Sequence, residues 1–157
     1  MHAVEHLLPD VTATASLASA LARLVVKGDV ILLEGDLGVG KTAFAKHFIN
    51  TLLDEPEEVP SPTFTLVQTF QTPDFSIWHF DLYRLQHEEE VYELGIEDAF
   101  AEGVSLIEWP GLAEAMLPEN ILTITLTYGE NKGSRKAILA GQGHWQEKLH
   151  HIIHYTE

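Results

Sequence analysis

The segment from residue 30 to residue 42, VILLEGDLGVGKT, constrains the fold of this chain more than any other part of it. Residues 30–34 are mostly branched and apolar, as expected for a strand that is buried on both faces of a parallel sheet. Gly35, four intervening residues and then Gly40-Lys41-Thr42 complete the pattern of a phosphate-binding loop, and helical spacing starts at Lys41. A strand, such a loop and a helix in succession predict an α/β fold, in which helices cover a central sheet.

The chemistry of this loop type depends on its backbone and on two side chains. Glycines let the backbone approach an anion, and the N–H groups at the start of the helix point toward it. The Lys41 ammonium can neutralise β- and γ-phosphate charge, and the Thr42 hydroxyl can bind magnesium. The residues expected to hold a nucleotide through this loop are Asp36, Leu37, Gly38, Val39, Gly40, Lys41, Thr42 and Ala43.

Length and charge limit the classes of protein that this chain can belong to. Its 157 residues fit a single domain, residues 1–157. The net charge of −15 argues against direct binding to DNA or RNA, because nonspecific affinity comes from neutralised phosphates, so any link to RNA should run through a basic partner. The chain has no cysteine, and no apolar run approaches the roughly 18 residues that span a membrane. We therefore expect a cytoplasmic protein without membrane or DNA partners.

A β-hairpin is expected after the irregular, proline-rich connection at residues 54–62. Two strand-like runs, 65–70 and 76–83, flank the turn sequence Gln71-Thr72-Pro73-Asp74. We therefore expect a three-layer fold, with helices on both faces of the sheet. Because the inserted hairpin is antiparallel, the central sheet should be mixed and mainly parallel. The other expected elements are an edge strand at 4–8, strands at 104–108, 121–127 and 136–140, and helices at about 12–28, 41–52, 88–100 with an interruption at 94–96, and from 145 onward.

Two carboxylates stand at strand ends, where they would face the phosphate-binding loop. Glu108 closes the apolar run 104–108, which has the form of the strand beside the loop in nucleotide hydrolases, where the terminal acid holds magnesium or orients water. Asp81 shares one face of its strand with His79 and Tyr83. We expect both acids to line the site and to reach magnesium directly or through water. Which of the two contacts the metal directly stays open.

Three other features each have a functional and a purely structural interpretation. Thr63 could contact the γ-phosphate or the metal as a nucleotide-sensing switch, but Ser-Pro-Thr is also an ordinary turn sequence. Trp109 could stack on the nucleotide base or form the wall of the site, and a buried aromatic at a strand end fits equally well. His150 and His154 have the i, i+4 spacing of zinc ligands, but no third ligand is in view, so we assign no metal there.

The chain contains only three arginines: Arg23, Arg84 and Arg135. An arginine finger can accelerate phosphoryl transfer by about 10³- to 10⁵-fold. Of the three, we expect only Arg84, beside the Asp81 motif, to lie where it could act within the same chain. The isolated protein is therefore expected to turn over slowly and to be activated by a partner.

Five motifs resemble, in order, those of one known family. They are GDLGVGKT at 35–42, SPTF at 61–64, HFDLYR at 79–84, ELGIEDAF at 93–100 and VSLIEW at 104–109. The combination is similar to the TsaE family, small bacterial ATPases of tRNA threonylcarbamoyladenosine biosynthesis. The resemblance implies a P-loop NTPase-like fold and magnesium-dependent hydrolysis of ATP to ADP in support of the TsaB-TsaD pair. In that pair TsaD transfers the threonylcarbamoyl group to the tRNA adenosine next to the anticodon.

The resemblance also implies a role for each matching residue. Lys41 would bind phosphate, and Thr42 and Glu108 would hold Mg²⁺. Asp81 would be the acidic catalytic residue, Thr63 the switch threonine, and Trp109 a neighbour of the nucleotide. Phe70 stands where a tyrosine is common in the family, so no hydroxyl role carries over to that position.

Two other functions remain open from the sequence. A small-molecule kinase of this fold would usually need a lid with several arginines, which three arginines spread along the chain do not supply. A nucleotide-dependent binding module, in which ATP or ADP only sets the affinity for a partner, would not require turnover.

Overall fold

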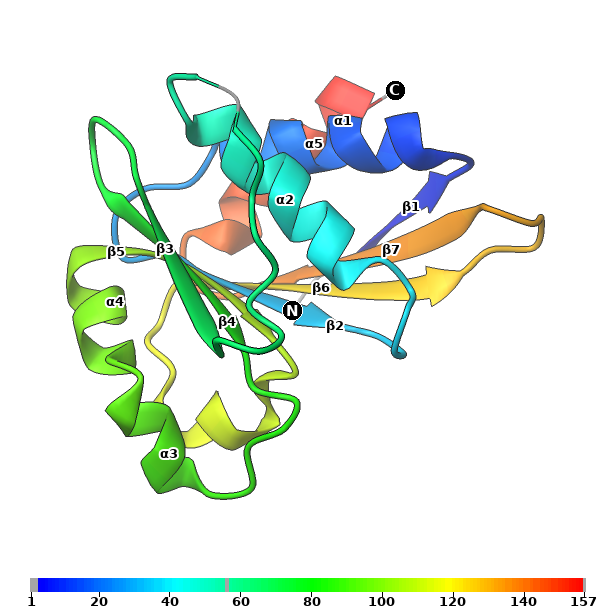
Figure 1. Cartoon of the computed structure of the whole chain (residues 1–157). Coiled ribbons are helices and arrows are strands. Elements are labelled where there is room, and N and C mark those ends of the chain that lie inside the picture. Colours follow the sequence, from blue (N-terminus) through cyan, green and yellow to red (C-terminus); the bar gives the residue numbers. More distant parts are fainter. Residues whose placement is uncertain (1–2, 56, 157) are drawn as a thin grey trace.

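The computed structural model describes residues 3–55 and 57–156, with side chains described through residue 152 (Figure 1). In this part of the chain seven strands form one sheet, in the order β1-β7-β6-β2-β5-β4-β3. The strands are β1 (Ala3–Leu8), β2 (Val30–Glu34), β3 (Val67–Gln71), β4 (Ser76–Asp81), β5 (Gly103–Glu108), β6 (Ile121–Tyr128) and β7 (Arg135–Gly141). The helices are α1 (Val11–Ala22), α2 (Lys41–Leu52), α3 (Glu88–Glu93), α4 (Ile96–Glu102) and α5 (Trp145–Thr156), with a 3-10 helix η1 (Pro110–Met116).

The direction of the strands divides the sheet into a parallel centre and antiparallel sides. Strands β6, β2, β5 and β4 are parallel, whereas β7 and β1 on one side and β3 on the other pair antiparallel with their neighbours. The expected mixed sheet and the β3–β4 hairpin are therefore confirmed, but parallel pairing is confined to the four central strands. Because these four strands run in the same direction, their carboxyl ends meet at one edge of the sheet.

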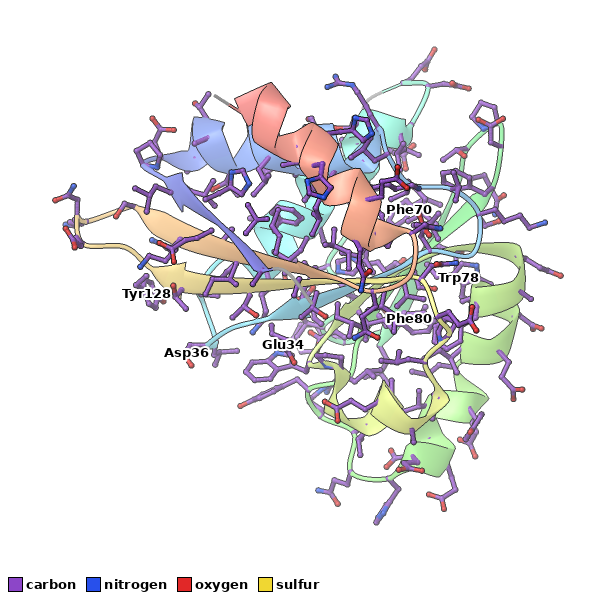
Figure 2. The ribbon with its side chains drawn as sticks, turned by 180° about the vertical axis from the view of Figure 1, so that it is seen from behind. Glu34, Asp36, Phe70, Trp78, Phe80 and Tyr128 are labelled. Carbon is purple, nitrogen blue, oxygen red and sulfur yellow. The ribbon has the colours of Figure 1, made fainter. Side chains whose placement is uncertain are left out.

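Helices cover both faces of the sheet, with α1, α2 and α5 on one face and α3, α4 and η1 on the other (Figure 1). Successive residues of β2, such as Ile31 and Leu32, enter different cores, so this strand is buried on both faces as expected. Figure 2 shows the same division at the hairpin, where Phe70 belongs to the core under α1 and α2. Trp78 and Phe80 lie on the opposite side, with their ring centroids 6.1 Å apart.

The boundaries of α1 depend on two aspartates. The carboxylate of Asp10 caps its start by accepting the N–H of Ala13 at 2.9 Å, as the sequence allowed. The helix ends at Ala22 rather than near residue 28, because a turn follows it in which the buried Asp29 carboxylate accepts the N–H of Val26 at 2.9 Å. The prediction of a longer helix was therefore wrong at its end.

The hairpin strands and the acidic helix also have identifiable limits. Strand β3 begins at Val67, two residues later than expected, because Leu66 has a left-handed backbone with φ +70°. Strand β4 ends at Asp81 rather than at Tyr83, since the Tyr83 N–H turns back and donates to the Asp81 carboxylate at 3.0 Å. The interruption expected near residue 95 is confirmed, because Gly95 has φ +85° and separates α3 from α4.

Helix α5 closes the fold by packing against α1 and β7 through the buried residues Trp145, Leu149 and Ile152. The side chain of His154 lies outside the described residues, so the predicted absence of a metal at the histidine pair stays a prediction. Within residues 3–55 and 57–156, the structure contains no helix with the length and apolar character needed to cross a membrane.

Candidate functional site

The phosphate-binding loop pattern lies at the carboxyl edge of the parallel strands, between β2 and α2. Its first glycine is required by space and by conformation: a Cβ on Gly35, at φ +141°, would collide with the carbonyl oxygen of Leu126 and lie 2.9 Å from Cγ1 of Val39. Gly40, at φ +118°, caps α2 without a side chain over the helix start. The N–H groups of the first helical turn are thus available to an anion.

A pocket of about 360 Å³ opens in front of this loop. Its lining residues are Leu37, Gly38, Gly40, Lys41, Thr42, Ala43, Thr63, Asp81, Tyr83, Arg84, Glu108 and Trp109. Val39, which was expected to bind the nucleotide, is buried in the core, so it can offer only its backbone. Asp36 is exposed and lines an adjoining cavity of about 500 Å³ together with Glu34, and Figure 2 shows these two residues near each other.

Thr42 and Glu108 meet inside the pocket, although they are far apart in the sequence. The Thr42 hydroxyl lies 2.8 Å from Oε1 and 3.0 Å from Oε2 of Glu108, and donates to this carboxylate. The parallel pairing of β2 with β5 makes this possible, because it sets Glu108 opposite Leu33 at the end of β2. On the other side of the carboxylate, Nε2 of the buried His79 lies 2.7 Å from Oε2.

Asp81 is the direct neighbour of Glu108 across the β4–β5 pair. Burial raises the pKa of the Asp81 carboxyl above its ordinary value, and the charge of Glu108 adds to the shift. Hydrogen bonds from the Tyr83 N–H and from Thr63 act in the opposite direction. The two acids expected at the site are therefore adjacent, and Asp81 holds a proton more readily than a free aspartate does.

Thr63 lies exposed at the rim of the pocket, in the segment that leads into β3. Its hydroxyl is 2.8 Å from the Ser61 hydroxyl. The guanidinium of Arg84 donates to the carbonyl oxygens of Thr63 at 2.9 Å and of Phe64 at 3.1 Å. Arg84 thus holds the backbone that carries Thr63.

Lys41 is buried in the wall of the pocket and contacts the loop itself. Its ammonium donates to the carbonyl oxygens of Gly35 and Asp36, and it lies 3.6 Å from the centroid of the Trp109 ring. Burial lowers the pKa of Lys41, while the charges of Glu108, Asp81 and Asp36 raise it in part. The carbonyl oxygens of the loop and the face of the Trp109 ring thus hold the Lys41 ammonium next to the place where an anion would lie.

Trp109 forms a wall between the pocket and the adjoining cavity, together with Tyr83. The two rings are tilted, with centroids 4.8 Å apart. Trp109 has φ +57°, a left-handed conformation that is uncommon for a residue with a side chain and occurs mainly at functional sites and turns. The structure therefore places Trp109 in the wall of the site, one of the positions considered from sequence.

Arg135 is a contact of the loop that the sequence analysis missed. Its Nε donates to the carbonyl oxygen of Val39 at 2.7 Å, and its guanidinium lies 4.6 Å from the centroid of the Tyr128 ring. Figure 2 shows Tyr128 on the same side of the molecule as Asp36. Residues 39 and 135 are too distant in sequence for any local pattern to have revealed the bond.

The oxygen atoms of the side chains in the pocket are suitable ligands for a magnesium ion. A threonine hydroxyl and a carboxylate, 2.8 Å apart at their closest atoms, are oxygen ligands of the kind that this hard cation prefers, and Asp81 lies in the same pocket. Within the described residues no group of three or more His, Cys, Asp or Glu side chains is placed to bind a metal. Few protein ligands are typical of magnesium, which usually keeps several waters and binds substrate phosphates.

Comparison with known proteins places this chain in a family. The model of the family described as "Threonylcarbamoyl adenosine biosynthesis protein TsaE" matches residues 8–137. The chain belongs to the TsaE family. The TsaE protein of Rickettsia bellii is 43% identical over 113 residues, which cover 72% of this chain and 78% of that protein. The TsaE protein of Bacillus subtilis is 40% identical over 114 residues, which cover 72% of this chain and 70% of that protein.

A solved structure has a similar fold over nearly the whole chain. The crystal structure of YdiB from Bacillus subtilis superposes with a TM-score of 0.79 at 28% sequence identity, and covers 98% of this chain and 95% of that one. The overall fold is therefore shared with a known structure. Both Bacillus and Rickettsia TsaE proteins carry the name of tRNA threonylcarbamoyladenosine biosynthesis proteins.

Proposed function

We propose that this TsaE-family protein is a magnesium-dependent ATPase that supports a TsaB-TsaD type complex in the threonylcarbamoylation of the tRNA adenosine next to the anticodon. The observation that supports it best is the meeting of Lys41, Thr42, Asp81 and Glu108 around one pocket at the start of α2. The names of the relatives supply the pathway.

The side chains of the pocket divide the work of hydrolysis. The backbone N–H groups of the loop and the Lys41 ammonium bind the phosphates, and Thr42 and Glu108 hold the metal. A bound magnesium ion supplies neutralisation of the charge on the transferred phosphoryl group. Asp81, whose pKa is raised by burial, orients the attacking water, and Thr63 at the rim responds to the γ-phosphate.

The positions of the arginines support the expectation that the isolated protein turns over slowly and is activated by a partner. Arg84 and Arg135 both donate to backbone carbonyls, and Arg23 lies on the rim of a groove between α1 and β1. The positive charge that stabilises the transferred phosphoryl group would then come from the partner. Contact with tRNA, which we propose takes place in the cytoplasm, would also be indirect, because the net charge of −15 repels a polyanion.

The same arrangement favours an ATPase over a small-molecule kinase. A kinase lid needs arginines that are free to close over the phosphates, whereas Arg84 and Arg135 are held on carbonyl oxygens. A module that only binds nucleotide would not need a second acid, Asp81, in the same pocket as the Glu108 carboxylate that Thr42 contacts.

Measuring phosphate release tests the proposal. The wild-type protein should release free phosphate from ATP in Mg²⁺, faster when a TsaB-TsaD type complex is added, and should stop in EDTA. Lys41→Ala should abolish turnover with and without the partner, because it removes the cation that faces the phosphates. Phosphorylated acceptor in place of free phosphate would support a kinase instead. If Lys41→Ala still binds nucleotide and still supports tRNA modification without hydrolysis, the binding module is correct.

A further inference from the structure

His79 is a fully buried polar side chain to which the proposed chemistry assigns no role. It lies in β4, on the face that it shares with Asp81, with 0% of its surface exposed. The strand register sets His79 beside Leu106 and Asp81 beside Glu108, so its imidazole reaches the Glu108 carboxylate diagonally. His79 does not line the pocket and therefore contacts this carboxylate from the protein interior.

The hydrogen-bonding pattern around His79 assigns the donor. An ionised carboxylate only accepts hydrogen bonds, so Nε2, which lies 2.7 Å from Oε2 of Glu108, carries a hydrogen. The other nitrogen, Nδ1, is buried and has no hydrogen-bond partner among the described residues. A second hydrogen, on Nδ1, would make the ring a cation with a buried N–H that has no acceptor, whereas a bare Nδ1 leaves only a neutral acceptor unpaired, which costs less. The imidazole with its hydrogen on Nε2 and none on Nδ1 fits both observations.

We propose that His79 is a positioning residue for the magnesium site, an inference that rests on the proposed function. Its Nε2–H holds Oε2 of Glu108 at 2.7 Å, whereas the Thr42 hydroxyl lies 2.8 Å from Oε1 and 3.0 Å from Oε2, so Oε1 is the carboxylate oxygen that would be available to a cation. The Thr42 hydroxyl is the other donor to this carboxylate, and it is itself a proposed metal ligand. His79 thus fixes the carboxylate independently of the metal, as outer groups do in many metal sites.

Two amide substitutions separate this role from simple filling of space. The amide nitrogen of His79→Gln can occupy the place of Nε2 and still donate to Glu108, whereas that of His79→Asn reaches only the place of Nδ1. ADP affinity is measured by calorimetry in EDTA and in saturating Mn²⁺, with thermal melting to check folding. His79→Asn should weaken ADP binding in Mn²⁺ by about 10- to 100-fold and leave it nearly unchanged in EDTA, whereas His79→Gln should stay within about threefold of wild type in both.

The possible results distinguish this inference from the proposed function. If the wild-type protein binds ADP equally well in Mn²⁺ and in EDTA, both the proposed metal site and the inference about His79 are wrong. The inference alone would be overturned if wild-type binding depends on the metal but His79→Asn binds ADP in Mn²⁺ as tightly as wild type, or if His79→Gln binds as weakly as His79→Asn.

A second measurement uses the wild-type protein alone, so it does not depend on the folding of a variant or on metal binding. The ¹⁵N spectrum of the histidine side chains in nucleotide-free wild-type protein should show His79 with a hydrogen on Nε2 and none on Nδ1. A hydrogen on Nδ1 and a bare Nε2 would mean that His79 does not donate to Glu108, and would overturn the proposal.

Discussion

Replacing Gly35 with alanine should destabilise the folded protein strongly. The added Cβ would collide with the Leu126 carbonyl oxygen and lie 2.9 Å from Cγ1 of Val39, and the backbone would keep φ +141°. The strained backbone costs about 1–3 kcal/mol, and forcing an extra carbon into a packed site costs about 1–3 kcal/mol more. We therefore expect the free energy of unfolding to fall by about 2–6 kcal/mol, and the melting temperature by about 2–4 °C for each kcal/mol.

Two other glycines provide matched controls, with unfolding followed by circular dichroism on heating and in urea. Gly40 has φ +118° but no atom within 4 Å of an added Cβ, so Gly40→Ala should show only the cost of strain, about 1–3 kcal/mol. Gly111 has neither a positive φ nor a close atom, so Gly111→Ala should change stability by less than about 1 kcal/mol. Equal melting temperatures for Gly35→Ala and Gly111→Ala would refute the reasoning.

Two further predictions concern groups around the pocket. The raised pKa of Asp81 means that its contribution to stability is full below the ordinary value of about 3.9 and is lost as pH rises through the folded-state pKa. Asp81→Asn, which keeps an acceptor for the Tyr83 N–H, should thus melt above wild type near neutral pH and lose this advantage in acid; an advantage that is independent of pH would contradict the assignment. Arg135→Met, which keeps the stem of the side chain but removes the donor to the Val39 carbonyl, should weaken ADP binding by about 3- to 10-fold in calorimetry. Lys136→Gln, which affects only the exposed pair with Glu5, should bind ADP normally, and equal binding by both variants would show that the Arg135 bond does not support the loop.

Local patterns predicted the elements that carry the loop, because those patterns are fixed by backbone chemistry. Strand β2 and the start of α2 at Lys41 lie where the sequence placed them, since the glycines between them have positive φ, which ends the strand and favours a turn. The break at Gly95 was visible for the same reason. Expected neighbours of the loop, Thr63, Asp81, Glu108 and Trp109, line one pocket, although their chemical roles stay predictions.

Contacts that depend on strand order and register could not be predicted from the sequence. The bond between His79 and Glu108 exists because β4 pairs with β5 in one particular register, and alternation along β4 indicated only the face of the strand. The bond from Arg135 to Val39 requires β7 to follow β6 in the sheet, which no motif specifies. The mixed sheet was expected, but the sequence did not show that parallel pairing is limited to the four central strands, with β1, β7 and β3 antiparallel at the sides.

The central claim is that hydrolysis at the pocket of Lys41, Thr42 and Glu108 supports tRNA modification. The most direct measurement is the formation of threonylcarbamoyladenosine in tRNA over many turnovers by a reconstituted TsaB-TsaD type complex, without this protein, with the wild type and with Glu108→Ala. Sustained turnover should require the wild-type protein and should fail with Glu108→Ala, because this variant loses the carboxylate that Thr42 contacts at 2.8 Å. Equal, sustained turnover in all three reactions would contradict the account.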